Sequence, residues 1–274
     1  MNTTTSTSTS TSTSTDSTRL VGHIARVGAV PTSTPAIEPR MNGPRRRANG
    51  GFATGTFADL VGGTATVALH RTVPLGRSFA VLETPEGLAV LDGDDVVATV
   101  RAATPFVVEP PVRPSYARAE EARRAYPYAG TRHALSDCVV CGTDRTDGLH
   151  VTPGPLPGHT GILAAPYDPP AWFAADGLAL PASVWGAMDC VSYPASLLAS
   201  GRIAFLGSLT AHRTRDIAVG EPLVAVGWTI GSGTRSHRTA SVLLDEDGRV
   251  IASAHAVWVE ARRQRLTRLA GRWL

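Results

Sequence analysis

Lysine is absent from this sequence, and cysteine is scarce. All 26 basic residues are arginine, and the 23 acidic residues leave a net charge of only +3. The arginines are mostly scattered, so the chain lacks the concentrated basic face typical of nucleic-acid binding, although its pI of ≈ 9.0 suits an anionic ligand. Three cysteines, one of them necessarily unpaired, argue against a disulfide framework and for a reducing compartment. We therefore expect a cytoplasmic protein with no nucleic-acid partner.

Long apolar stretches are missing as well. No apolar run reaches the roughly 18 residues that a membrane span needs. No basic region followed by an apolar stretch opens the sequence, so we expect neither a membrane span nor a secretory signal. Apolar residues still make up 43% of the 274 residues, which is enough for a sizeable core in one large domain or two smaller ones.

The longest segment with helical periodicity is residues 181–199. Pro181 suits the first turn of a helix, whereas Pro194 removes an amide donor and should bend the helix. Asp189 lies beside the apolar stripe. A carboxylate in an apolar helix is costly unless it is solvated or partnered, and such groups cluster at functional sites. Asp189 is therefore either a solvated residue on the helix rim or a functional one. The apolar residues recur at spacings of three and four: Val184, Trp185, Met188, Val191, Ala195 and Leu198.

A second short run of helical spacing, through Phe52 and Leu60, begins at Asn49–Gly50–Gly51. Glycines at a helix start let a substrate approach backbone N–H groups, and helix N-termini favour anions. An ordinary glycine-rich turn would leave the same pattern.

Strand-like segments follow each predicted helix, separated by glycine-containing or acidic turns. Each half of the chain therefore reads as one helix followed by an antiparallel meander. Two further short strands, 149–152 and 161–165, are predicted before the second helix. The meander segments are 64–73, 78–83, 88–91 and 95–108 in the first half, and 202–213, 222–230, 237–244 and 250–260 in the second.

Two short matches relate the halves. The string 68–72 resembles 210–214, with His70 aligned to His212, and the string 91–98 resembles 244–252. The offsets between the copies, 212 − 70 = 142 and 244 − 91 = 153, differ by 11 residues, and variation in hairpin length explains that difference. Because a helix with one apolar face needs a sheet to cover it, we predict an α+β fold of two similar helix-on-antiparallel-sheet units.

The string Cys138–Val139–Val140–Cys141–Gly142 has the cysteine spacing of half a zinc knuckle. The second half is missing from the sequence. Cys190 lies in the predicted helix, and the nearest other candidates are His133 and His150. Because structural zinc sites usually have four ligands, a structural turn with unreactive thiols is favoured and no metal is predicted.

A duplicated unit of one helix and a long meander resembles the double-hotdog fold, and more closely the type II, TesB-like acyl-CoA thioesterases. Asn49–Gly50–Gly51 is similar to that family's His-Gly-Gly segment, with Asn in place of His, and Asp189 with Pro194 reproduces its Asp-x4-Pro. Segments 69–79 and 245–259 are similar to the family's Arg-containing strand exit and closing strand. The Cys-x-x-Cys-Gly insertion also resembles an actinobacterial branch of the thioesterase-like superfamily.

The resemblance implies hydrolysis of an acyl-CoA or carrier-bound thioester, with Asp189 as the catalytic carboxylate. It implies no cofactor beyond the CoA of the substrate, and it suggests a homodimer. In the family, a Thr and a Gln on two strands help the Asp to orient water. The matching positions here fall near Ala204 and Ala256, which cannot hydrogen-bond through their side chains. The residues that would contact substrate are Asn49, Gly50 and Gly51, with backbone N–H groups for the oxyanion, and Trp185, Met188 and Tyr193, which would line an acyl tunnel.

Two other functions remain open. A non-catalytic acyl-thioester binder or scaffold is favoured by the missing Thr and Gln. An enoyl-thioester hydratase or dehydratase of the same fold would pair its Asp with a His, but no Asp-x4-His occurs near Asp189.

Together these patterns divide the chain into five parts. They are a Ser/Thr-rich disordered tail (1–18), an N-terminal hotdog unit (19–108), a linker containing the Cys-x-x-Cys-Gly turn (109–147), a C-terminal hotdog unit (148–263) and a basic tail (264–274).

Overall fold

The computed structural model describes residues 34–133 and 135–264. The tail predicted for residues 1–18 lies outside the described residues, as do the first part of the predicted N-terminal unit and nearly all of the predicted basic tail.

Four α-helices and one short 3-10 helix are described. They are α1 (Gly50–Ala58), α2 (Tyr116–Arg124), η2 (Ala171–Phe173), α3 (Pro181–Val191) and α4 (Ala195–Ser200). Pro181 occupies the first turn of α3, as predicted. Instead of one bent helix over 181–199, the chain forms two helices separated at Ser192–Pro194, because Pro194 has no N–H to continue the hydrogen-bond ladder. No described helix has both the length and the apolar character for a membrane span.

Ten antiparallel strands form one continuous sheet in the order β2-β3-β4-β1-β9-β12-β11-β10-β6-β5. The strands of the first half are β1 (Ala65–Leu69), β2 (Ala80–Thr84), β3 (Gly87–Asp92) and β4 (Asp95–Ala102). The strands that follow are β5 (Gly154–Pro155), β6 (Ile162–Tyr167), β9 (Ala204–Arg213), β10 (Leu223–Ser232), β11 (Ser236–Leu244) and β12 (Val250–Glu260). A separate small hairpin pairs β7 (Ala174–Ala175) with β8 (Leu178–Ala179).

The strand order confirms the duplication. In the sheet the first unit has the strand order β2-β3-β4-β1, and the second has the same order read from the other side, β10-β11-β12-β9. Strands β1, β2, β3 and β4 therefore correspond to β9, β10, β11 and β12. The units meet where residues 65–68 of β1 pair with residues 208–211 of β9. The two predicted sheets are therefore joined edge to edge, and neither β1 nor β9 is left as an open edge.

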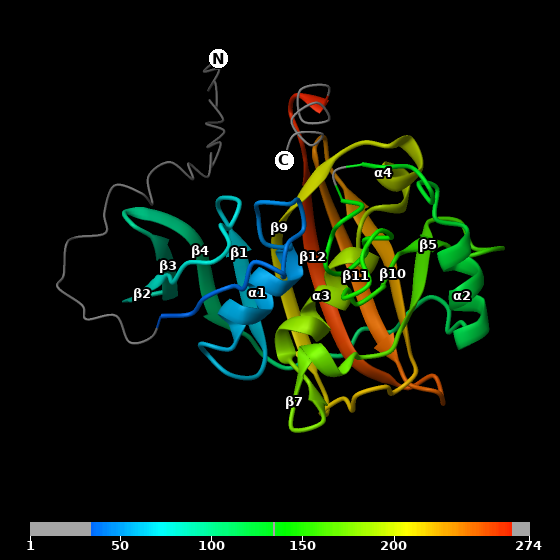
Figure 1. Cartoon of the computed structure of the whole chain (residues 1–274), viewed down its shortest axis with the longest axis horizontal. Helices are drawn as coiled ribbons and strands as arrows, with labels where there is room; N and C mark the ends of the chain where they lie inside the picture. Colours follow the sequence, from blue (N-terminus) through cyan, green and yellow to red (C-terminus); the bar gives the residue numbers. More distant parts are fainter. Residues whose placement is uncertain (1–33, 134, 265–274) are drawn as a thin grey trace, which may run out of the picture. The chain divides into compact units, whose positions relative to one another are not determined.

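Helices α1 and α3 lie side by side over one face of this sheet (Figure 1). The main hydrophobic core lies beneath them and draws on both units, from Phe52 and Val67 to Met188 and Leu243. Gly227 of β10 lets α3 approach the sheet closely, because a Cβ at this position would fall 2.0 Å from the Val191 carbonyl oxygen of that helix.

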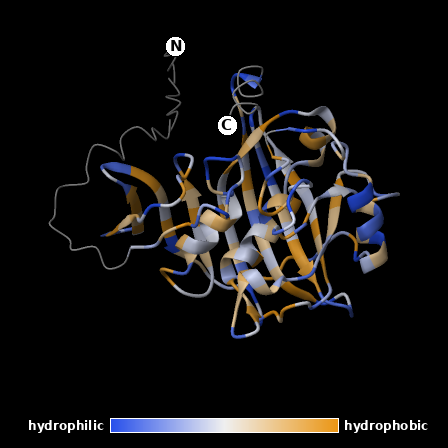
Figure 2. Ribbon diagram, in the orientation of Figure 1, coloured by the Kyte–Doolittle hydropathy of each residue, from blue (hydrophilic) through white to orange (hydrophobic). Residues whose placement is uncertain are grey.

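The opposite face is covered by the segment between the units. Phe106 stacks on His255 of β12, and the Val108 N–H donates to Ser253 Oγ over 3.0 Å. Helix α2 continues this cover and buries Ala119 and Ala122 against strands of the second unit. Figure 2 shows hydrophilic residues on α2 and hydrophobic residues concentrated in the strands. The predicted linker is thus a packed layer over part of its length.

The segment predicted as a strand over 149–152 is not one. Its backbone instead bonds to the loop that carries the Cys-x-x-Cys sequence: Leu149 N–H donates to Val139 O (2.7 Å) and Val151 N–H to Val140 O (2.9 Å). These bonds hold that loop against the core.

Candidate functional site

Helices α1 and α3 touch almost backbone to backbone because glycines line their contact. A Cβ on Gly51 would fall 2.5 Å from the Asp189 Cβ and 2.6 Å from the Gly186 Cα, and one on Gly55 would fall 2.6 Å from the Ala182 Cα. This approach places the Asp189 side chain, from the second unit, at the N-terminus of α1, from the first.

Asp189 is a buried carboxylate with one bound and one unbound oxygen. Its Oδ2 accepts the Gly51 N–H over 2.8 Å, whereas Oδ1 is buried without a hydrogen-bond partner among the described residues. The residue is only 2% exposed, so it is not the solvated rim residue of the alternative interpretation. Burial raises the pKa of the carboxyl to about 7, with a smaller upward contribution from Cys138, while the Gly51 N–H and Asn49 act in the opposite direction.

Asn49 caps α1 and faces the cysteines at the same time. Its Oδ1 accepts the Phe52 N–H over 3.0 Å, as an N-cap residue does. Its Nδ2 points to the Cys138 Sγ at 3.7 Å and the Cys190 Sγ at 3.6 Å. The Asn that stands where the resembled family has His therefore links the helix start to two thiols.

The two glycine N–H groups predicted to hold an oxyanion are not equivalent here. The Gly51 N–H is taken by Asp189, whereas the Gly50 N–H belongs to the first residue of α1, where a helix leaves its N–H groups without intrahelical partners. A Cβ on Gly50 would fall 3.4 Å from Asp189 Oδ2 and 3.0 Å from Leu206 Cδ2, so Leu206 covers this position.

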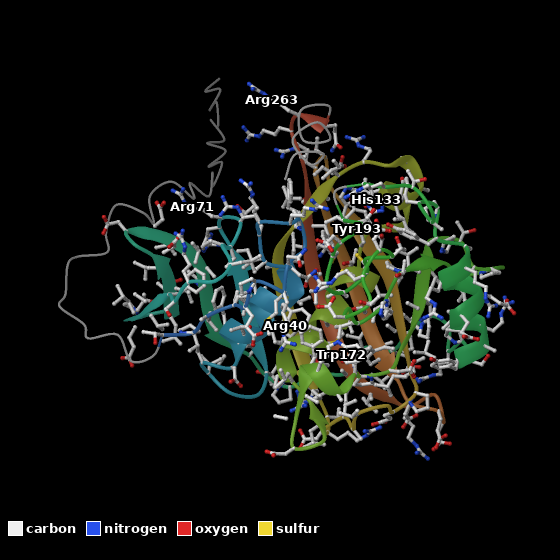
Figure 3. The ribbon with its side chains drawn as sticks, viewed as in Figure 1. Arg40, Arg71, His133, Trp172, Tyr193 and Arg263 are labelled. Atoms are coloured by element: carbon white, nitrogen blue, oxygen red, sulfur yellow. The ribbon has the colours of Figure 1, made fainter. Side chains whose placement is uncertain are left out.

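Trp185, Met188 and Tyr193, the predicted lining of an acyl tunnel, are packed residues in this structure. Trp185 and Met188 are buried, and the Met188 carbonyl accepts the Ser241 hydroxyl over 2.9 Å. The Tyr193 hydroxyl (labelled in Figure 3) donates to the Arg202 carbonyl over 2.6 Å. Two cavities are lined by other residues, and neither touches Asp189. The tunnel remains a prediction.

The strand positions that correspond to the family's Thr and Gln lack polar side chains. Ala204 and Ala256 both belong to the main core. Polar residues of the same strands face away from the helices: Thr210 Oγ1 bonds Thr66 Oγ1 over 2.8 Å, while Ser253 bonds the segment that covers the opposite face. Alternation along the strand therefore excludes them from the Asp189 side.

Two buried hydroxyls on β11 were missed by sequence reasoning. Ser241 bonds the carbonyl of the residue before Asp189, and Thr239, two positions away on the same strand face, has a buried Oγ1 with no partner among the described residues. The alternation of polar and apolar residues in β11 was the available signal, but only the helix packing shows which face meets α3.

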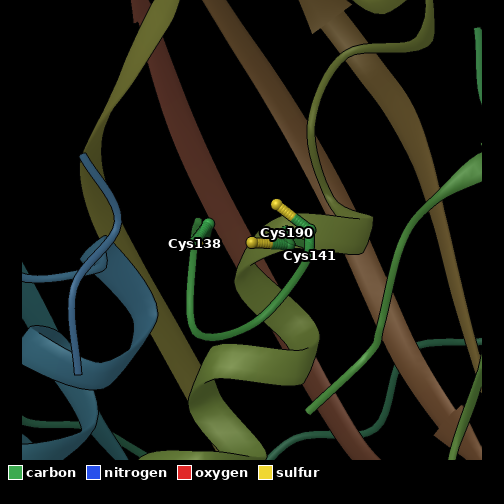
Figure 4. A group of neighbouring side chains, drawn as sticks. All are labelled: Cys138, Cys141 and Cys190. Carbon is green, nitrogen blue, oxygen red and sulfur yellow. The ribbon is translucent and has the colours of Figure 1, made fainter. Parts of the chain in front are cut away.

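The structure brings Cys190 next to the Cys-x-x-Cys loop. The sequence does not predict this contact, because Cys190 lies in a helix far from the loop in the chain. The three sulfur atoms lie within 4.8 Å of one another, with Cys138 and Cys190 buried and Cys141 partly buried (Figure 4). Hydrogen bonds from the other two thiols, and then from the Cys141 and Val140 backbone N–H groups, hold the pKa of the Cys138 thiol well below its usual value. The corresponding bonds with Cys138 raise the pKa of Cys141 and of Cys190.

His133 and His150, the other metal-ligand candidates, do not join this cluster. His133 Nε2 faces the Tyr126 hydroxyl at 3.3 Å, and its Nδ1 accepts the Leu135 N–H over 3.2 Å. His150 lines a cavity with Tyr126 and Gly142, and it is not part of the group of three sulfurs.

No family model and no curated protein sequence matches the chain. Solved structures are similar to it, and two of them match most of the chain. A candidate thioesterase from Novosphingobium aromaticivorans matches with a TM-score of 0.52 and 16% identity over 82% of this chain and 93% of that one. The TesB protein of Mycobacterium avium subspecies paratuberculosis matches with a TM-score of 0.51 and 12% identity over 80% of this chain and 89% of that one. At such identities the likeness shows the fold, and the predicted double hotdog is confirmed.

Proposed function

We propose that the protein hydrolyses acyl thioesters of CoA or of a carrier protein, with Asp189 as the catalytic carboxylate. The observation that carries the proposal is the buried carboxylate at the junction of the two units, whose Oδ1 has no partner among the described residues. A carboxylate oxygen is costly to bury without a hydrogen-bond partner, and carboxylates in such costly positions cluster at functional sites. The shared fold with a TesB protein and a candidate thioesterase supports the same chemistry.

In the proposed reaction a water molecule bound at Asp189 Oδ1 loses a proton to the carboxylate as its oxygen attacks the thioester carbonyl carbon. The developing oxyanion lies near the Gly50 N–H at the start of α1, where the helix dipole favours negative charge. The C–S bond then breaks, the sulfur takes the proton from Asp189, and a carboxylic acid and a free thiol leave. Direct attack by the carboxylate is the alternative route, with water hydrolysing the resulting anhydride. No separate cofactor takes part in either route.

Substrate entry requires a rearrangement of side chains. Asp189 is 2% exposed and neither cavity touches it, while Leu206 packs over Gly50. The closed core around the carboxylate would exclude bulk water from the reaction once the thioester is bound.

The second candidate function is a non-catalytic binder of acyl thioesters. It is favoured by the apolar Ala204 and Ala256 and by the closed site. The hydratase alternative has less support, because the Asp189 carboxylate accepts a hydrogen bond from the Gly51 backbone N–H and not from a histidine.

A panel of saturated and unsaturated acyl-CoAs separates these functions. Thiol release is followed with a thiol-reactive dye, binding by calorimetry, and hydration by loss of the enoyl chromophore. Thiol release with at least one chain length is the expected result. Binding without release would instead establish the binder, and hydration without release the hydratase.

A further inference from the structure

The three cysteines form a group that the proposed hydrolysis does not use. Two come from the loop that follows the first unit, and the third comes from α3 of the second unit, next to Asp189. Their sulfur atoms lie within 4.8 Å of one another. In a tetrahedral zinc site with Zn–S bonds of about 2.3 Å, neighbouring sulfurs are about 3.8 Å apart, so a shift of about 1 Å at most would close this group around an ion.

We propose that Cys138, Cys141 and Cys190 bind one soft cation of the zinc class as thiolates. Soft thiolate ligands select such cations over hard ones. Three protein ligands leave the fourth tetrahedral position for water or another small ligand.

The surroundings of Cys138 already suit a thiolate. Its sulfur is buried, and Asn49 Nδ2 donates to it over 3.7 Å. The same Asn49 Nδ2 lies 3.6 Å from the Cys190 sulfur. Metal sites depend on such outer donors, which orient the ligands and offset their charge.

The loop is held in its ligand conformation by bonds outside the cysteines. The Gly142 N–H donates to the Cys138 carbonyl over 2.9 Å, closing the turn, and a Cβ on Gly142 would fall 2.5 Å from that oxygen. The Val139 N–H donates to the Asn42 carbonyl over 2.8 Å. A preformed site of this kind loses little conformational freedom when an ion binds.

Cys141 is the one partly exposed thiol of the three, and the residue that follows it lines a cavity. The cavity of about 220 Å³ is lined by Gly142, the next residue, and by Tyr126 and Thr152. An incoming ion would therefore first meet the group at Cys141.

The same three sulfurs could instead be inert thiols, or two of them a disulfide, and each possibility has its own signature. Inert thiols retain no metal and leave three thiols to titrate in the unfolded chain. A disulfide leaves one thiol and lowers the mass by the two hydrogens lost to an oxidant. The metal site leaves three thiols after the ion has been removed.

The test is carried out on the full chain. Protein purified without chelators is analysed for metal content, then stripped and titrated with Co²⁺, which gives thiolate charge-transfer absorption in the near ultraviolet when cysteines bind it. We expect about one equivalent of zinc per chain, saturation at one Co²⁺, and displacement of the Co²⁺ spectrum by Zn²⁺. Absence of both bound metal and the Co²⁺ spectrum would overturn the proposal, with the thiol count showing which alternative holds.

Variants assign the ligands. Cys138→Ser, Cys141→Ser and Cys190→Ser should each weaken Co²⁺ binding at least 10-fold, whereas Thr143→Ala should not, because Thr143 is exposed and its hydroxyl donates to the neighbouring Asp144 carboxylate. Unchanged binding in the Ser variants would overturn the assignment. Should a Ser variant fail to fold, the wild-type spectrum and stoichiometry still decide whether the site exists. None of these readouts depends on thioester hydrolysis, so failure of the proposed function would not be mistaken for failure of the metal site.

Discussion

Asn49 shows at the scale of one residue how a motif can be kept in place while its chemistry changes. Its position before two glycines matches the resembled family, but an amide has replaced an imidazole. The amide oxygen caps α1 and the amide nitrogen faces two thiols. An amide can do both, since it carries an acceptor and a donor at once.

Replacing Asn49 by Ala should lower the free energy of unfolding by about 1 kcal/mol, because the Phe52 N–H loses its cap. Asn49→Ser restores an acceptor at the cap and should recover most of that loss. Urea unfolding of the three proteins measures both effects. Equal stabilities of the Ala and Ser variants would contradict the capping role.

Arg145 has a buried side chain that the sequence pattern did not reveal. Its side chain is 8% exposed and donates to the Asn42 side chain, to the Asp137 carbonyl and to the Asp147 carboxylate. These bonds tie the Cys-x-x-Cys loop to the segment before α1. Among scattered arginines in a sequence without lysine, nothing marked this one as buried.

Arg145→Ala should destabilise the fold by about 2–3 kcal/mol, because it leaves the buried Asn42 side chain without its charged donor. The pair with Asp147 adds little, since that carboxylate is exposed and screened by solvent. Arg132→Ala, at an exposed position earlier in the same segment, is the matched control and should change stability by less than about 0.5 kcal/mol. Thermal or urea unfolding compares the two, and similar losses would argue against a special role for Arg145.

At the scale of elements, the sequence predicted that helices begin near Gly50 and Pro181, and both do. It did not show that α3 ends before Pro194 instead of bending there, because a missing amide is compatible with either outcome until the packing is known. It also gave no sign that Gly51 and Gly186 face each other, since contacts between helices depend on how the elements pack.

Gly51→Ala should separate α1 from α3. The added Cβ would fall within 2.7 Å of the Asp189 Cβ, the Gly186 Cα and the Trp185 carbonyl, two of which are backbone atoms that cannot rotate away. We expect a loss of about 1–3 kcal/mol in stability, in the range of other overpacked cores. Thr56→Ala in the same helix adds no atom and serves as the control. Urea unfolding that shows no loss for Gly51→Ala would contradict the close contact.

At the scale of the whole described fold, the internal repeat correctly predicted two helix-and-meander units. Their joining through β1 and β9 pairs segments more than 130 residues apart, and no local pattern specifies which edges meet. For the same reason the sequence could not bring Cys190 to Cys138 and Cys141, although it placed all three correctly on a helix and a loop. The sequence does show that the carboxylate of Asp189 conflicts with the apolar residues around it, and the structure buries that carboxylate.

The shared core predicts that the units unfold together. Residues of both contribute to one hydrophobic cluster, and α1 of one unit packs on α3 of the other. Calorimetry should therefore show a single transition whose calorimetric and van't Hoff enthalpies agree. Two resolved transitions would mean that each unit folds by itself, contrary to the continuous sheet and core.

The measurement that tests the central claim most directly is thiol release by Asp189→Asn, with the best acyl-CoA substrate of the wild-type protein. The amide keeps the shape of the side chain but cannot take a proton from water, so the rate should fall about 10²–10⁴-fold while the circular dichroism spectrum is unchanged. Asp176→Asn, in an exposed turn whose positive φ of 52° suits Asn, controls for loss of one carboxylate and should hydrolyse at the wild-type rate. Full activity in folded Asp189→Asn would contradict the role assigned to this carboxylate.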